Sequence, residues 1–481
     1  MISNASSTKM AAAGAVMGLM VAGCAVGPQY RPPEVVVPAA WNQAQQAGID
    51  TRSAGLARWW TEFNDPLLNT LVERAAQSNL DLRLAEARIR ESRALRAVTA
   101  AGQWPALETS GSYTRSRASE NAFSSGRDGS SSLGVNGAQD FFRAGFDASW
   151  ELDVFGGVRR SVEAADASVD ASVEERRQTL VTLLGDVARN YIDLRGFQSR
   201  LAVARSNLQA QQETLELTRV RFEAGLSSDL EVAQAEGQVN RIAAEIPVLE
   251  SGAKQSAHRL DILLGLQPGA LSAELGGDAP VPALPPQAHV GMPAELLRRR
   301  PDIRRAERLL AAATAQVGAA TADLYPRFSL GGGFGVQSIS AGDLFTAPSR
   351  FWSIGPALFW PVFDAGRIRA SIAVRSAQQE QALTLYEKTV LTAFEDVENS
   401  LVSYANEQTR YRSLIAAVAA NRRAVQMADE LHTRGLVDFL NVLASQRALY
   451  ESESELAQSE TIMASNLVAL YKALGGGWDT D

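Results

Sequence analysis

A chain of 481 residues can bury several hydrophobic cores, so length alone would suggest more than one domain. The formal net charge of −8 at pH 7 gives no electrostatic basis for binding nucleic acid, and the three histidines are too scattered in sequence to predict a metal site. The one cysteine, Cys24, excludes a disulfide within the chain, and no Ser/His/Asp set or carboxylate pair at a recognisable spacing predicts an enzyme.

The first segment, residues 1–23, is predicted to be a lipoprotein signal peptide. Its apolar run, Met10–Val21, is long enough for a signal peptide and too short to span a membrane as a helix. Two small residues and Cys24 follow in the pattern of a bacterial lipobox, so a covalent lipid on Cys24 is the only cofactor-like group that we expect. The alternative is an ordinary secretory signal that happens to contain a cysteine. Ala25 stands where aspartate typically retains lipoproteins in the inner membrane, so the outer membrane is favoured.

Residues 24–65 are rich in proline and alanine over most of their length and are predicted to be extended. A first repeat is then expected over residues 66–265. Its helices are predicted from capping residues, glycines and apolar periodicity. They comprise a helix from Pro66, with Asp65 as N-cap, to about Gly102, a very long helix over residues 157–223, and a return helix to about Leu264.

Strands are predicted from strict alternation of apolar and polar residues. In residues 144–153, Phe146 and Trp150 fall on one face, while Asp147 and Glu151 fall on the other. In a soluble sheet, the apolar face would pack on a core and the polar face would meet water. In a membrane barrel, the apolar face would meet lipid and the polar face a water-filled lumen. Each run has about ten residues, enough to cross a bilayer when tilted. The other three runs cover residues 107–114, 328–337 and 352–362, and aromatic residues near the run ends suit a membrane interface: Trp104, Phe141, Phe142, Phe351, Trp352 and Trp360.

The second half of the chain repeats the first. Asp81 and Pro105 recur 221 positions later as Asp302 and Pro326, and Gly225 recurs 210 positions later as Gly435. The offset changes in the loop between the paired strands, because this loop is shorter in the second repeat. Loops vary in length more than helices and strands do. A second repeat is therefore predicted over residues 294–475, after a proline-rich linker, 266–293, and before a tail, 476–481.

The long helices carry apolar residues every seven positions, which predicts left-handed coiling against neighbouring helices. An ordinary bundle has the same spacing, but 67 residues at a rise of about 1.5 Å form a rod of about 100 Å. The return helix is about half as long, and a preceding helix, 66–102 or 294–324, supplies the remainder of a second rod. The seam residues are Leu201, Leu208, Leu215 and Phe222, with Tyr411, Val418, Val425 and His432 at the same places in the second repeat.

Four membrane strands cannot close a barrel, because about eight are needed. Open edges in lipid would leave unpaired backbone groups that cost several kcal/mol each. If the strands are in a membrane, several chains must combine them, and three chains would give twelve strands and twelve helical rods. The expected fold is a helical barrel wall plus four transmembrane strands per chain, joined in a trimer.

Motifs throughout the mature chain resemble the TolC-like outer membrane efflux proteins of the lipoprotein (NodT or OprM) type. The resemblance implies a homotrimer with a 12-stranded β-barrel and a 12-helix α-barrel, anchored to outer-membrane lipid. It also implies a passive exit duct that docks on a periplasmic adaptor and an inner-membrane pump, usually of the resistance-nodulation-division class. The matching residues are Cys24-Ala25-Val26-Gly27-Pro28, Trp59-Trp60 with Asp65-Pro66-Leu67, Arg300-Pro301-Asp302-Ile303, Pro361-Val362-Phe363-Asp364, and Tyr471 to Trp478.

Two other functions remain open. A periplasmic adaptor or scaffold would need one helical hairpin, without duplication or aromatic-bounded strands. A stand-alone uptake porin would not need rods of about 100 Å. The exported compounds cannot be identified from the sequence.

In this family, side chains just past the second turn close the periplasmic end, commonly aspartates six and nine residues after the turn glycine. Here those places hold Asn441 and Ala444, so the acidic pattern is missing. Asp438 is the nearest carboxylate, but both it and Asp229 are interpreted first as helix N-caps. Arg434 and Arg221 could pair with them. The gate candidates are Asp438, Leu440, Asn441, Leu443, Ala444 and Arg434.

The turns between the long and return helices are the expected contacts for an adaptor, since a partner would meet the tips of a tube wall. Their glycines also have a simpler interpretation, because glycine allows the positive φ of a tight turn. The adaptor-contact candidates are Gly225, Leu226, Ser227, Gly435, Leu436 and Val437.

Overall fold

The computed structural model describes residues 25–42, 49–50, 56–117, 119, 138–277, 279–285 and 287–479. The predicted signal peptide and Cys24 lie outside the described residues, as does most of the first strand-to-strand loop. The chain divides into two compact units, and each draws on both halves of the sequence. The first comprises residues 1–33, 90–170 and 307–384, and the second comprises residues 34–89, 171–306 and 385–481.

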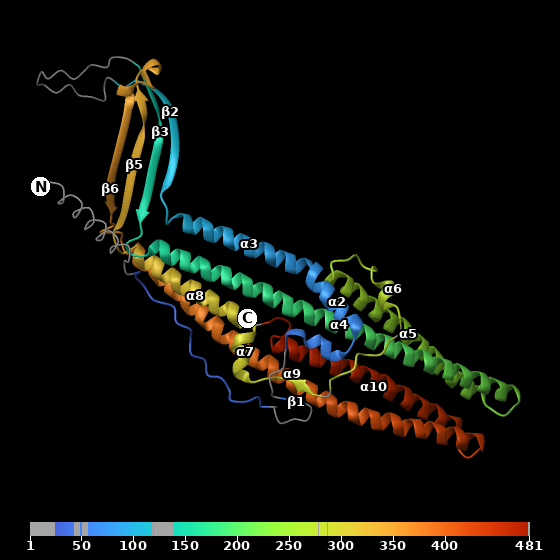
Figure 1. Ribbon diagram of the computed structural model, residues 1–481. Helices are drawn as coiled ribbons and strands as arrows, with labels where there is room; N and C mark the ends of the chain where they lie inside the picture. Colours follow the sequence, from blue (N-terminus) through green and yellow to red (C-terminus); the bar gives the residue numbers. More distant parts are fainter. Residues whose placement is uncertain are drawn as a thin grey trace, which may run out of the picture. The chain divides into compact units, whose positions relative to one another are not determined.

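The first unit contains a four-stranded antiparallel sheet in the order β2-β3-β5-β6 (Figure 1). Its strands are β2 (Ala106–Ser116), β3 (Gln139–Leu152), β5 (Arg327–Ser338) and β6 (Arg350–Phe359). The central pair, β3 and β5, joins the two repeats, and its register sets Trp150 opposite Leu330 and Phe146 opposite Phe334. The apolar positions of the two repeats therefore share one face, as their alternation predicts. β2 and β6 are the edges.

The fourth strand is shorter than expected. The prediction that it continues to Val362 is wrong, because β6 ends at Phe359. Pro361 follows two residues later, and proline has no N–H for a strand ladder. Trp360 instead donates its indole N–H to the carbonyl of Leu324 (3.0 Å), as Trp150 at the end of β3 does to Gln103 (3.0 Å).

The helices confirm the internal duplication. The long helices α4 (Gly157–Glu223) and α9 (Arg367–Thr433) have 67 residues each, and the return helices α5 (Asp229–Leu263) and α10 (Phe439–Ala473) have 35 each. Both ends of each pair differ by the 210 positions read from the sequence. None of the helices in the described ranges is long and apolar enough to cross a membrane.

The helix that precedes the strands in each repeat is broken into two. The prediction of single helices over 66–102 and 294–324 is therefore wrong. The first consists of α2 (Pro66–Ser78) and α3 (Leu80–Ala101), and the second of α7 (Pro293–Arg299) and α8 (Pro301–Ala322). Asn79 separates the first pair with extended backbone and accepts the N–H groups of Asp81 (2.9 Å) and Leu82 (3.1 Å), which starts a new helix. Arg300 separates the second pair, because the residue before proline avoids helical backbone.

Each break lies where a return helix ends, in the second unit. Asn79 donates its side-chain N–H to the carbonyl of Leu263 (2.9 Å), and Arg300 donates to the carbonyl of Ala473 (3.2 Å). Asn79 and Arg300 occupy equivalent places in the repeats, as do Leu263 and Ala473. The last carbonyls of a helix have no hydrogen-bond donor within that helix. The side chains of Asn79 and Arg300 supply such a donor to α5 and α10, at the points where α3 and α8 begin.

The largest core lies in the second unit. It is centred on Trp59, Phe63 and Tyr471, which are fully buried together with apolar residues of α2, α4, α9 and α10. Asp65 is the expected N-cap of α2 and accepts the N–H groups of Leu67 (2.9 Å) and Leu68 (3.0 Å). The remaining short elements are β1 (Ile49–Asp50), which pairs with β4 (Ala288–His289), η1 (Leu56–Phe63), α6 (Ser272–Leu275), η2 (Ala341–Asp343) and η3 (Ala347–Ser349).

Candidate functional site

The two helix turns, both in the second unit, have the same backbone structure. Gly225 and Gly435 have φ of +71° and +69°. The N–H of Leu226 bonds the carbonyl of Arg221 (2.8 Å), and that of Leu436 bonds the carbonyl of Leu431 (2.9 Å), which closes a Schellman motif at each helix end. The simpler interpretation of the glycines as turn residues is confirmed, and it leaves their role as adaptor contacts a prediction.

Apolar side chains are exposed at both turns. Leu226 and Leu230 of the first turn are 71% and 64% exposed, and their equivalents Leu436 and Leu440 are 67% and 54% exposed. Gly225 and Gly435 are exposed beside them, whereas Ser227 and Val437 are half-buried. Four solvent-facing leucines at repeated positions form a surface that a partner protein could cover.

The capping residues differ from the prediction. The interpretation of Asp229 as the N-cap of α5 is wrong, because Ser228 has the extended backbone of a cap and its hydroxyl accepts the N–H of Glu231 (3.4 Å). Asp438 does occupy the N-cap position of α10, but its carboxylate accepts no capping hydrogen bond. Its backbone carbonyl accepts the N–H of Asn441 (3.0 Å), so the exposed Asp438 carboxylate is not committed to the helix end.

Arg221 bonds a histidine rather than an aspartate. Its Nη1 lies 3.1 Å from Nε2 of His432, and Nδ1 of the same ring lies 3.1 Å from the carbonyl oxygen of Val437. Because arginine only donates, Nε2 must accept and Nδ1–H must donate to Val437. In the described part of the chain, neither Arg221 nor Arg434 forms an ion pair with Asp229 or Asp438, so that expected pairing is wrong.

His432 therefore connects α4 of the first hairpin with the turn of the second. Sequence reasoning placed it only in the heptad seam and missed this link. The available signal was a polar ring at the seam position that Phe222 occupies in the first repeat. The ring also packs 5.8 Å, centroid to centroid, from the buried Phe439.

The gate candidates fall into two groups. Leu440, Asn441 and Ala444 are exposed and share one face of α10, and Arg434 and Asp438 are exposed beside them. Leu443 is half-buried and packs against the cluster of Leu215, Ala235, Ala428, Phe439 and Val442. Leu443 therefore packs inside its own hairpin pair, whereas Leu440, Asn441 and Ala444 are free to close a gate.

A cavity of about 480 Å³ lies between the two hairpins beside these residues. Arg221, Glu231, Asp429 and His432 bring charged and polar groups to its wall. Burial raises the pKa of the Asp429 carboxyl, and the neighbouring His432 opposes that shift. The hairpins thus enclose a space with both polar and apolar walls, beside the apolar cluster around Phe439.

Further polar links join the hairpins away from the turns. Gln211 of α4 donates to Gln446 of α10 (2.9 Å), and Tyr450 of α10 donates its hydroxyl hydrogen to Glu245 of α5 (2.5 Å). Burial, and then the bond to Glu245, raises the pKa of the Tyr450 hydroxyl, so it stays protonated as a donor.

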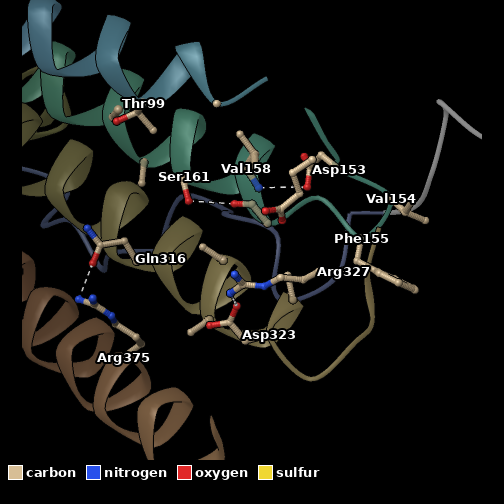
Figure 2. Close-up of a pocket in the computed structure, with 18 of the residues that line it drawn as sticks. Thr99, Asp153, Val154, Phe155, Val158, Ser161, Gln316, Asp323, Arg327 and Arg375 are labelled. Carbon is tan, nitrogen blue, oxygen red and sulfur yellow. Dashed lines mark hydrogen bonds and ion pairs between the residues drawn. The ribbon is translucent and has the colours of Figure 1, made fainter. Parts of the chain in front are cut away.

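The first unit has its own cavity, of about 780 Å³, where α3, α4, α8, α9 and the strand ends meet. Figure 2 shows Arg375 of α9 facing Gln316 of α8 (3.0 Å) and Asp323 facing Arg327 (2.5 Å). Asp153 accepts the N–H groups of Val158 (3.0 Å) and Arg159 (2.8 Å) and so caps α4. These polar groups satisfy one another, which suits a hydrated wall. Within the described residues, no group of His, Cys, Asp and Glu could hold a metal ion.

Comparisons with known proteins agree on one family. The family model described as "Outer membrane efflux protein" matches residues 71–266 and 292–476. Nodulation protein T of Rhizobium leguminosarum bv. trifolii is 33% identical over 466 residues, which cover 96% of each chain. The pyoverdine export outer membrane protein OpmQ of Pseudomonas aeruginosa is 33% identical over 464 residues, again 96% of each chain.

Solved structures show the same fold. The outer-membrane channel OprN superposes with a TM-score of 0.87 at 37% identity, over 95% of this chain and all of that chain (100%). The MtrE outer membrane channel of Neisseria gonorrhoeae, in its open state, gives a TM-score of 0.80 at 28% identity, over 95% of this chain and 99% of that chain. The fold is therefore that of the TolC-like outer membrane channels, as the sequence predicts.

Proposed function

Because the chain belongs to the outer membrane efflux protein family, we propose that three copies of it form a passive exit duct through the outer membrane. The duct receives its substrates from an inner-membrane pump, of the resistance-nodulation-division class, through a periplasmic adaptor. It supplies no energy and selects no substrate by itself. The comparisons give no support to the alternative of a periplasmic adaptor or scaffold.

The main support for this proposal is that the four-stranded sheet is open at both edges. Among the described residues, β2 and β6 each have one edge without a partner strand, and four strands are too few to close a cylinder. In lipid, each unpaired backbone group at an edge would cost several kcal/mol. Pooling the strands of three copies removes every edge and encloses a polar lumen, with the apolar face toward lipid.

The adaptor is proposed to dock at the turns. Gly225, Leu226 and Ser227 of the first turn and Gly435, Leu436 and Val437 of the second are its expected contacts. The exposed leucines at these turns would bury apolar surface against the tip of an adaptor helix hairpin. Export relatives support a pump partner, since one is named for pyoverdine export and another as a toluene efflux pump protein of Pseudomonas putida.

The gate is proposed at the beginning of α10. Leu440, Asn441 and Ala444 share an exposed face, and three copies of this face would meet where the rods converge. Arg434 and Asp438 lie next to it. The two polar links from Arg221 to His432 and from His432 to Val437 are proposed to hold this hairpin against α4 in the closed state.

A lipid on Cys24 is proposed to anchor the chain. The residues that follow are attached in the first unit, where Val26 donates its backbone N–H to the carbonyl of Phe155 (3.1 Å), just beyond β3. Tyr30 donates to Glu307 (2.9 Å) a few residues later. A lipid on Cys24 would therefore be held close to the end of a membrane strand.

Purification from outer membranes tests the proposal. Mature protein is expected to require detergent, to have the mass of three chains, to dissociate on heating in dodecyl sulfate and to form ion-conducting pores in planar bilayers. Labelled palmitate should enter the wild type and be absent from Cys24→Ser. Protein that is monomeric and soluble without detergent, or trimeric without conductance, would overturn the duct.

A further inference from the structure

The contact between the two hairpins at their turns depends on the charge of one side chain, His432. Nε2 of this imidazole lies 3.1 Å from Nη1 of Arg221, and Nδ1 lies 3.1 Å from the carbonyl oxygen of Val437. Arginine can only donate, so the first contact is a hydrogen bond only while Nε2 carries no proton. The second contact persists in both charge states, because Nδ1–H donates in the neutral ring and in the imidazolium alike.

The two contacts of the ring join different parts of the molecule. His432 is in the last turn of α9 and Val437 follows it in the same hairpin, whereas Arg221 is in the last turn of α4, in the first hairpin. A proton on Nε2 would set an imidazolium against a guanidinium at a separation of 3.1 Å, which replaces an attraction by a repulsion. Protonation therefore removes the link between the hairpins and leaves the turn of the second hairpin intact.

The carboxylates around the ring offer each of the two cations a partner within its own hairpin. On α9, Asp429 lies about one turn before His432, and their interaction lowers the pKa of the Asp429 carboxyl against the larger rise that burial causes. On α5, Glu231 belongs to the wall of the cavity that Arg221 and His432 also line. From α10 the ring meets Phe439, which carries no charge. The imidazolium can thus pair with Asp429 and the guanidinium with Glu231, without any link between the hairpins.

The ring is accessible to protons. His432 is half-buried, and it lines the cavity of about 480 Å³ between the hairpins, which is large enough to hold water. Histidine is the side chain whose charge ordinarily changes between about pH 5 and 8. The positions equivalent to Arg221 and His432 in the other repeat hold Leu431 and Phe222, which do not titrate. A charge-dependent link therefore replaces an apolar pair at one of the two equivalent places.

We propose that the contact of Arg221 with His432 is a pH-sensitive latch, which keeps the helix-turn end of the duct closed near neutral pH and releases it in mildly acidic surroundings. The inference rests on the proposed duct and specifies how its gate is regulated. In the closed state the guanidinium excludes a proton from Nε2, whereas in the open state the ring binds one freely. The closed state thus binds fewer protons, so the open fraction must rise as the pH falls.

Single-channel recordings in planar bilayers at about pH 7.5 and about pH 5.5, without adaptor, test the latch. For the wild type, the fraction of time spent at high conductance is expected to rise about tenfold at the lower pH. His432→Gln keeps an acceptor for Arg221 and a donor for Val437 at both pH values, so it should stay closed and change less than about twofold. His432→Phe supplies the residue of the first repeat and has no link, so it should be equally open at both pH values.

A second histidine provides the matched control. His258 is exposed on α5 and is not part of the cavity wall, so His258→Gln should respond to pH as the wild type does. A wild type with the same open fraction at both pH values, or a His432→Gln channel with the full response, would overturn the latch, while a conducting trimer left the duct intact. A monomeric wild type that never conducts would instead overturn the proposed function.

A cross-link tests the same movement without altering the latch itself. Gln211 of α4 donates to Gln446 of α10 (2.9 Å), so these side chains form a second contact between the hairpins. Gln211→Cys/Gln446→Cys, bridged by a short bis-methanethiosulfonate reagent, should remain closed at both pH values, and reduction of the bridge should restore the response. A bridged channel that still opens at the lower pH would overturn the latch, because the hairpins would not need to separate.

Discussion

At position 432 the second repeat carries a histidine where the first carries Phe222. An apolar seam residue can only pack, whereas the imidazole accepts from Arg221 with Nε2 and donates to the carbonyl of Val437 with Nδ1–H. One substitution between the repeats thus adds a directional link between the hairpins. The link lies within a turn of the proposed gate, which makes it a candidate for control of opening.

Removing this link is expected to favour the open channel. In Arg221→Gln, the hydrogen bond to His432 is lost, and a contribution of about 1 kcal/mol corresponds to roughly a fivefold shift toward open states. Single-channel recordings in planar bilayers, without adaptor, measure the fraction of time spent at high conductance. Arg219→Gln is the matched control, because Arg219 pairs with Glu236 (2.5 Å) inside one hairpin. Equal effects of the two variants would contradict a specific latch.

Charge at the proposed gate should change ion selectivity. Asn441→Asp or Ala444→Asp would place one carboxylate per copy on the exposed face of α10, so three would meet at the constriction. We expect cations to be favoured, which a shift of reversal potential in a salt gradient measures. Ala233→Asp, exposed on α5, is the control. If the control shifts the potential as much, these positions do not line the narrowest point.

At the scale of elements, the sequence predicts whole helices better than their interruptions. The bounds of α4 follow from its glycine and its heptad seam, and the structure agrees with them to the residue. The break at Asn79 could not be predicted, because no proline or glycine marks it. Its cause is the carbonyl of Leu263, a partner 184 residues away that only the folded chain brings near.

The break at Asn79 offers a stability test. Asn79→Ala removes the cap of α3 and leaves the Leu263 carbonyl buried without a donor, which should cost about 1–3 kcal/mol. Asn79→Asp keeps an acceptor for the N–H groups of Asp81 and Leu82 but has no N–H for Leu263. We expect both variants to lower the temperature of thermal unfolding. If Asn79→Asp behaves as the wild type, the bond to Leu263 contributes nothing and the cap alone matters.

The candidate site could be predicted only in part, because some of its contacts, like that of Asn79 with Leu263, join residues that are far apart in the sequence. Turn glycines at 225 and 435 are local features, so their positive φ could be predicted. Which of Leu440 and Leu443 faces solvent depends on the cluster around Phe439, which combines residues of both repeats. Apolar periodicity does not encode side-chain partners between distant segments. For Arg221 and His432, the one local signal is a polar ring at the seam position that Phe222 occupies in the first repeat.

For the whole molecule, duplication explains why helices and strands recur along the chain and why the sheet has two outer strands, β2 and β6. The junction of the repeats satisfies β3 and β5 in the centre of the sheet, while β2 and β6 keep the same edges open at its sides. A duplicated unit that packs on its own copy has complementary faces at its two ends. In the proposed trimer, the outer strands of neighbouring copies would pair with each other and close the cylinder.

Docking and conduction should be separable in the assembled duct. Leu226→Asp/Leu436→Asp places charges on the exposed apolar turns, where burial against an adaptor would leave them unpaired, so complex formation should fall by at least about tenfold. The isolated trimer should keep its conductance, because neither side chain packs in the core. Co-purification with the adaptor, and export of the pump's substrate from cells that express each variant, measure the loss. Leu226→Met/Leu436→Met keeps the surface apolar and should retain binding and export. Export that survives the aspartates, in a channel present at normal levels, would place the adaptor elsewhere on the chain.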